Sequence, residues 1–146
     1  MIEQAIQRLE FLCNTMPSLL HALDETTISF KLSTNKWSKK EIIGHLIDSA
    51  TNNHQRFIRG QFEDIPLITY NQDSWNTYSY HQRIKTHQLI AFWETYNWQL
   101  LAIIKHISEE HLSRQVNTGQ QTHSLKFLIN DYVEHLEHHL KQLVSY

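Results

Sequence analysis

The sequence has few of the residues that build disulfide-rich or turn-rich proteins. Its 146 residues include one cysteine, two prolines and three glycines. A single cysteine excludes an internal disulfide framework and a cysteine-rich zinc finger, so nothing calls for an oxidising compartment and we expect a cytoplasmic protein. The scarcity of glycine and proline argues against an all-β fold and favours long helices.

An excess of one charge sign and a long apolar run are also lacking. The formal net charge is -2 with acidic and basic residues interspersed, so there is no basic stripe for a phosphate backbone, and we expect no nucleic-acid partner. Polar side chains interrupt the apolar residues of segment 1–23, which predicts neither a signal-peptide core nor a membrane span. The length fits one domain, residues 1–146.

Apolar residues recur at helical spacing in four segments, which predicts an all-α fold. The first segment covers residues 2–23 and contains Pro17, which can kink or split a helix. The second begins near Ser38, which forms a capping-box pattern with Glu41, and ends near Gly60. The third covers residues 81–107 and the fourth residues 123–144.

The connections between these segments predict the topology of a four-helix bundle. Residues 61–80 show no clean periodicity, and residues 108–122 are a polar connection. A long second connection is what a bundle needs when its second and third helices run parallel, because the chain must return along the whole bundle. We therefore expect the down-up-up-down order, with a crossover between helices two and three.

Three histidines are candidates for one metal site. His135 and His139 are four residues apart and so share one face of the fourth helix. With a rise of ~1.5 Å per residue, His45 lies ~10 Å from the start of its helix and His139 ~9 Å from the end of its own. These heights match when the two helices are antiparallel, as the crossover topology requires. Three neutral imidazoles with open coordination positions are typical of a catalytic metal site.

Other readings of these residues are open. The chain has 11 histidines, so a pair at this spacing also arises by chance and can be a surface or core pair. The candidate pocket residues lie on the same helix flanks as the three histidines or in the aromatic-rich connection 61–80, whose rings can instead cap the end of the bundle. They are Asn52, Arg56, Tyr70, Asp73, Trp75 and Gln142, with Tyr78 as a further ring at the mouth of the site.

Three short segments together resemble the DinB-like superfamily of YfiT-type metalloenzymes. They are KWSKKEIIGHLIDS at residues 36–49, YNQDSW at residues 70–75 and DYVEHLEHHLKQ at residues 131–142, and the likeness extends over the whole chain. The resemblance implies a four-helix bundle with a divalent metal held by His45, His135 and His139. Zinc or nickel is the first expectation, with iron or manganese as alternatives.

The resemblance also implies a function. Members include thiol-dependent S-transferases and isomerases as well as hydrolases, so we expect a metal-dependent transferase or hydrolase with a small-molecule substrate, which can be a low-molecular-weight thiol. Homodimers are frequent in the family. The alternative is a stress-associated helical binding module, without enzymatic activity, in which the metal is structural or incidental.

Overall fold

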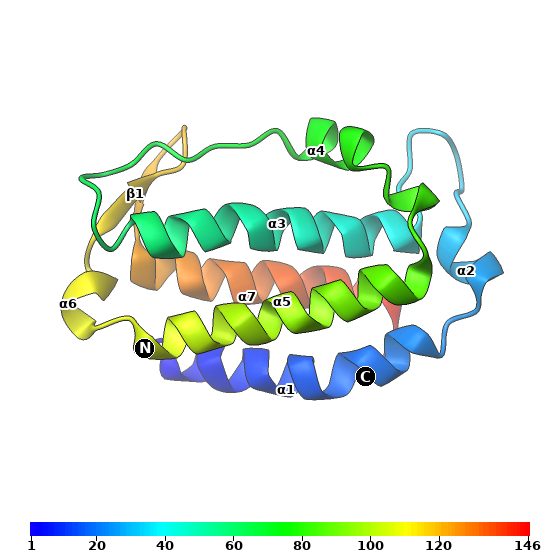
Figure 1. Cartoon of the computed structure of the whole chain (residues 1–146), viewed down its shortest axis with the longest axis horizontal. Helices are drawn as coiled ribbons and strands as arrows, with labels where there is room; N and C mark the ends of the chain where they lie inside the picture. The colour runs from blue at the N-terminus through cyan, green and yellow to red at the C-terminus, as the bar shows by residue number, and fades with distance from the viewer.

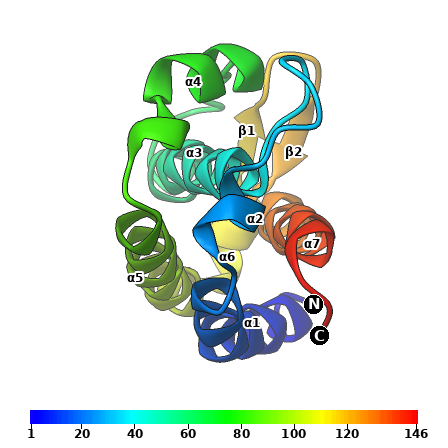
Figure 2. The same ribbon diagram turned by 90° about the vertical axis from the view of Figure 1, so that its right-hand side faces the viewer.

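The computed structural model describes residues 1–146 and consists mainly of helices (Figure 1). Four long helices form a bundle: α1 (Glu3–His21), α3 (Lys39–Arg59), α5 (Thr86–His106) and α7 (Leu125–Leu143). The shorter elements are α2 (Glu25–Ser29), α4 (Gln72–Ser79), the 3-10 helix η1 (His81–Arg83), α6 (Glu109–Leu112) and a hairpin of β1 (Gln115–Asn117) and β2 (Thr122–Ser124). An end-on view places α4 outside α3 (Figure 2).

The helix directions confirm the predicted topology. Helices α1 and α7 run one way along the bundle, and α3 and α5 run the other way (Figure 1). The chain between α3 and α5 returns along the outer side of α3, and there Ile68 and Pro66 exchange backbone hydrogen bonds with Asn117 of β1. This crossover leaves α3 and α7 antiparallel, which is the arrangement that the histidine heights require.

Side-chain caps explain where the helices of the site begin. Ser38 and Glu41 form the predicted capping box of α3, and Gly60 ends that helix. The Ser124 hydroxyl accepts from the Phe127 backbone amide and starts α7. Because these caps fix the first residue of each helix, they also fix which faces point into the bundle.

The structure corrects several predicted boundaries. The connection 61–80 contains α4, which the sequence pattern missed because the helix is short. It begins after Asn71, whose side chain accepts a hydrogen bond from the Ser74 backbone amide. The third long helix begins at Thr86, since Tyr80 adopts a left-handed conformation with φ 55° and breaks the chain direction. The fourth begins at Leu125, because residues 115–124 form the hairpin. Helix α1 continues through Pro17.

The hydrophobic core lies between the four long helices and contains 30 buried residues. Its largest fully buried side chains include Trp93, Tyr132 and Phe57. The Tyr132 hydroxyl donates to Asn97 over 2.6 Å, which ties α7 to α5 and satisfies the buried phenol. The histidines of interest lie at the margin of this core, so the bundle packs without depending on them. None of the helices is long and apolar enough to cross a membrane.

Candidate metal centre

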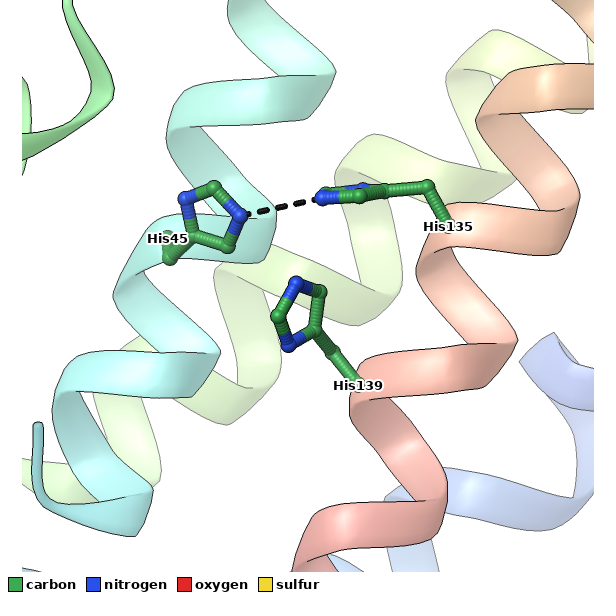
Figure 3. A group of neighbouring side chains, drawn as sticks. All are labelled: His45, His135 and His139. Atoms are coloured by element: carbon green, nitrogen blue, oxygen red, sulfur yellow. Dashed lines mark hydrogen bonds between the residues drawn. The ribbon is translucent and has the colours of Figure 1, made fainter.

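The structure brings His45 of α3 together with His135 and His139 of α7 (Figure 3). One ring nitrogen from each lies within 4.8 Å of the others. His45 Nε2 and His135 Nε2 are 3.1 Å apart, and the His139 ring centroid lies 4.8 Å from that of His45 and 4.6 Å from that of His135. The prediction that the three imidazoles meet is thus matched by the geometry.

The spacing of the His45 and His135 nitrogens suits a shared divalent ion. Imidazole nitrogens bind zinc at ~2.0–2.1 Å, so two of them at a tetrahedral angle lie about 3.3–3.4 Å apart. The 3.1 Å between His45 Nε2 and His135 Nε2 is close to this value. No cysteine or carboxylate belongs to the group, so three protein ligands would leave further positions for water or substrate.

Burial keeps the imidazoles of His45 and His135 neutral at pH 7. Burial, reinforced by His135 and His139, lowers the pKa of His45 from 6.5 to about 3. Burial also lowers the pKa of His135 to about 4, with His139 adding to the effect and Asp131 opposing it. A neutral imidazole has the nitrogen lone pair that binds a metal, whereas an imidazolium has none.

Gln142 orients His139 from the outside. The His139 Nδ1 atom lies 2.9 Å from Gln142 Oε1, and since an amide oxygen only accepts, Nδ1 carries the proton and Nε2 keeps its lone pair. The Gln142 amide nitrogen faces His138 Nε2 at 3.5 Å, which fixes the direction of the amide. Such outer hydrogen bonds set the tautomer of metal-binding histidines. Gln142 thus contacts the cluster, as its position beside the histidines suggested.

The other candidate pocket residues are distributed along the crossover side of α3. Asn52 is buried and donates to the Asp48 carbonyl, and Arg56 donates to the carbonyl of Ile68 over 3.1 Å. Tyr70 is half-buried, and its phenol lies near Ser49 and Arg56. Asn52 and Arg56 follow His45 along one flank of α3, and Tyr70 lies on the connection between α3 and α4.

The aromatic side chains of the connection 61–80 are only partly buried. Trp75 packs its ring against Tyr70 with centroids 5.9 Å apart and is half-buried. Asp73 is exposed in the first turn of α4, and Tyr78 is 72% exposed. The structure therefore does not bring Asp73 or Tyr78 into contact with the three histidines.

Sequence reasoning missed Trp37 at this site. Its ring packs against that of His45 with centroids 4.9 Å apart. The buried Nδ1 atom of His45 has no hydrogen-bond partner. Trp37 lies just before the cap Ser38, so its direction depends on the loop and not on a helical period. The only signal in the sequence was an aromatic residue next to a strong helix cap.

Comparison with known proteins identifies the family. A family model described as the DinB superfamily matches residues 8–143. Two relatives carry the name "Putative metal-dependent hydrolase". One, from Halalkalibacterium halodurans, is 35% identical over 66 residues, which are 42% of this chain and 39% of that protein. The other, from Bacillus cereus, is 23% identical over 149 residues and covers 99% of this chain and 84% of its own length.

Solved structures show the same fold. YfiT from Bacillus subtilis, described as "a probable metal-dependent hydrolase with an unusual four-helix bundle topology", superposes with a TM-score of 0.87 at 18% identity, covering 97% of this chain and 82% of that one. The mycothiol-dependent maleylpyruvate isomerase superposes with a TM-score of 0.80 at 14% identity, covering 99% of this chain and 61% of the isomerase. This chain belongs to the DinB superfamily.

Proposed function

We propose that this chain is a divalent-metal-dependent enzyme that acts on a small molecule, with His45, His135 and His139 as the metal ligands. The observation that carries the proposal is the convergence of three ring nitrogens within 4.8 Å, with no other protein ligand in the group. The lowered pKa of His45 and of His135 supports it, because both rings are then ready to bind a cation without losing a proton.

Each neighbouring side chain has a role in this proposal. Gln142 holds the tautomer of His139, and Trp37 packs against His45 and keeps its ring in place. A divalent ion with an open coordination position would lower the pKa of a bound water or thiol toward neutrality. The histidines position that group, and the core margin around them limits access of bulk water.

Arg56 is the candidate for binding an anionic group of the substrate. Its guanidinium is held by neutral acceptors, the Ile68 carbonyl and the Asn53 side chain, and its Nε has no partner. Burial lowers the pKa of this guanidinium. A half-buried cation without a bonded carboxylate favours an anionic ligand. We propose Asn52 and Tyr70 as walls of the same pocket, with Asp73 and Trp75 at its outer edge.

Thiol transfer is the first candidate reaction and hydrolysis the second. One structural neighbour is named a mycothiol-dependent maleylpyruvate isomerase, and the Bacillus cereus relative is named a "Putative metal-dependent hydrolase". A three-imidazole site suits either reaction, since the same ion would activate a thiol or a water. Zinc and nickel are the first candidates for the metal, because imidazole ligands suit both, and iron and manganese are the alternatives.

Metal analysis of protein made without an affinity tag, followed by a thiol-transfer screen against a panel of electrophiles, tests this proposal. We expect one divalent ion per chain and turnover that disappears on chelation and returns when the ion is restored. A protein that binds one ion tightly, turns over nothing and unfolds on chelation would contradict it. That result would favour the binding module with a structural metal.

The homodimer and the cytoplasmic location are further parts of the proposal. Neither follows from the geometry of the site. Light scattering at several protein concentrations tests the dimer, and a mass equal to one chain at all of them would contradict it. Fractionation of source cells tests the location.

A further inference from the structure

The groove that the proposed function assigns to the substrate is closed in this structure. Asn52 is 2% exposed, and Ser49, one turn after His45 on α3, is 3% exposed. The Arg56 Nε atom is buried and has no hydrogen-bond partner. Tyr70, on the crossover, has its phenol near both Ser49 and Arg56. A ligand that reaches the Arg56 Nε atom therefore needs the covering chain to move.

Residues 70–79, which we call the strap, cover this face of α3 with little apolar contact. The strap contains α4, which lies outside α3 (Figure 2). Its one buried residue is the polar Asn76, while Trp75 is half-buried. Because an isolated helix of 8 residues is unstable in water, α4 depends on these few contacts. Segments with few buried apolar contacts open at low cost in free energy.

Few hydrogen bonds fasten the strap to the bundle. The Asn76 side-chain amide donates to the Glu41 carbonyl over 2.9 Å. The Ser79 hydroxyl donates to the Asp48 carboxylate over 3.4 Å, which is long for a bond of this kind. Both bonds lie in the second half of the strap, so its first half is held mainly by the partly buried ring of Tyr70.

The polar side chains of α3 beneath the strap bond to their own helix. Asn52 donates to the Asp48 carbonyl, and Asn53 donates to the Ser49 carbonyl. The Arg56 guanidinium donates to Asn53, on the same helix. Lifting the strap therefore breaks none of these bonds, and it gives the partnerless Arg56 Nε atom access to a ligand.

Both ends of the strap are fixed. Before it, Ile68 is buried, and its amide donates to β1 over 2.9 Å. After it, His81 Nε2 lies 3.1 Å from Asp48 Oδ2, and the His81 ring packs on Gly44, where an added Cβ atom would lie 2.1 Å from the ring. Between the strap and His81, Tyr80 has the left-handed φ of 55°, which is uncommon for a residue with a side chain. Such strained positions cluster at ligand clamps and switch regions.

We infer that the strap is a lid, which lifts from α3 between the fixed points Ile68 and His81 and admits an anionic substrate to Arg56. The inference rests on the proposed function, since the lid opens the route to the groove beside His45. The movement leaves the packing of the long helices intact, because the hydrophobic core contains no residue of the strap.

Thiol labelling of metal-free Ser49→Cys protein with methyl methanethiosulfonate tests the inference. The buried Cys13 of α1 is the internal reference, because only unfolding of the bundle exposes it. We expect the introduced thiol to react about a hundredfold faster than Cys13, since the strap opens without unfolding of the bundle. Equal labelling rates of the two thiols would overturn the inference.

A matched pair of variants in the Ser49→Cys protein tests the fastening. Asn76→Ala should raise the labelling rate of the introduced thiol about fivefold, because one hydrogen bond no longer holds the strap. Gln72→Ala, at an exposed position of α4, is the control and should leave the rate unchanged. Equal rates in the two variants would contradict the role of Asn76 and with it the lid.

Hydrogen exchange of the parent protein is a second measurement that needs no substitution. The amides of α4 should exchange together, and about a hundredfold faster than those in the middle of α5. Equal protection of α4 and α5 would overturn the inference. Metal titration separates it from the proposed function. A protein that binds no metal but has an opening strap counts against the proposed function, and one that binds metal under a closed strap counts against the lid alone.

Discussion

Histidines lie at two faces of α3, a group of three toward α7 and the single His81 toward η1, and the two sites differ in the partners of their rings. Toward α7, His45 meets two further histidines and no carboxylate, so its neutral ring is left to bind a cation. Toward η1, His81 is bonded to Asp48, which fixes one nitrogen and leaves the other free. The comparison teaches that the partner of a histidine, more than its burial, decides whether it can serve as a metal ligand or as a fixed polar anchor.

Removing one histidine from the α7 side should have the largest effect. His139→Ala should abolish metal binding and leave a folded helical protein, because the 30-residue core does not include the cluster. Calorimetric metal titration and circular dichroism measure the two properties. His106→Ala, an exposed histidine near the end of α5, is the control and should bind metal normally. An unfolded His139→Ala protein would mean that the cluster is part of the scaffold.

Acid should destabilise the metal-free protein through the same cluster. The pKa of His45 and of His135 is lowered on folding, so the unfolded chain takes up protons first and stability is lost as the pH falls below about 6.5. Between pH 7 and pH 5 each of these two histidines should lower the free energy of unfolding by on the order of 2 kcal/mol, as one pKa unit corresponds to about 1.4 kcal/mol.

Urea unfolding at a series of pH values measures this loss. Glu137, whose pKa the Arg8 guanidinium lowers to about 2, adds its own loss only below about pH 4.5, where the unfolded carboxylate is protonated. The two effects are thus separated on the pH scale. His135→Gln should reduce the loss above pH 5, and an unchanged pH profile in that variant would contradict the assignment.

Filling the space at Gly44 tests the η1 side. Gly44→Ala places a methyl group on the His81 ring and should lower the free energy of unfolding by about 1–3 kcal/mol, although alanine is the better helix former. Urea unfolding measures the effect, with Gln55→Ala on the exposed face of α3 as the control. Metal affinity should stay within a few fold. A stabilised Gly44→Ala protein would mean that His81 does not pack as described.

The smallest effect concerns the outer hydrogen bond of His139. Gln142→Ala should weaken metal binding about tenfold, the low end for outer-shell partners, because Gln142 is exposed. Gln142→Glu keeps an acceptor for His139 Nδ1 and should restore most of the affinity. If both variants bind metal like the parent protein, Gln142 does not orient the ligand.

The sequence predicted those parts of the molecule that follow from helical period and connection length. The bundle, its crossover and the meeting of His45 with the α7 pair depend on spacing along regular helices, and these expectations agree with the structure. The capping box at Ser38 was predicted because it is a local interaction between residues three apart.

The residues that escaped prediction are held by irregular backbone. Trp37 is placed by a loop, and His81 by the left-handed turn at Tyr80, whose conformation no side-chain pattern announced. Gly44 in the middle of a helix was the one sequence signal for the contact with His81, because a glycine there indicates a close neighbour. Its neighbour could not be named without the fold.

A crystal structure of untagged protein grown with zinc or nickel, with anomalous scattering recorded at the edge of that metal, tests the central claim most directly. We expect one strong anomalous peak, with a ring nitrogen of His45, His135 and His139 each at ~2.0–2.1 Å from it and at least one position filled by solvent. A peak coordinated elsewhere, or one that binds the α7 pair without His45, would contradict the account.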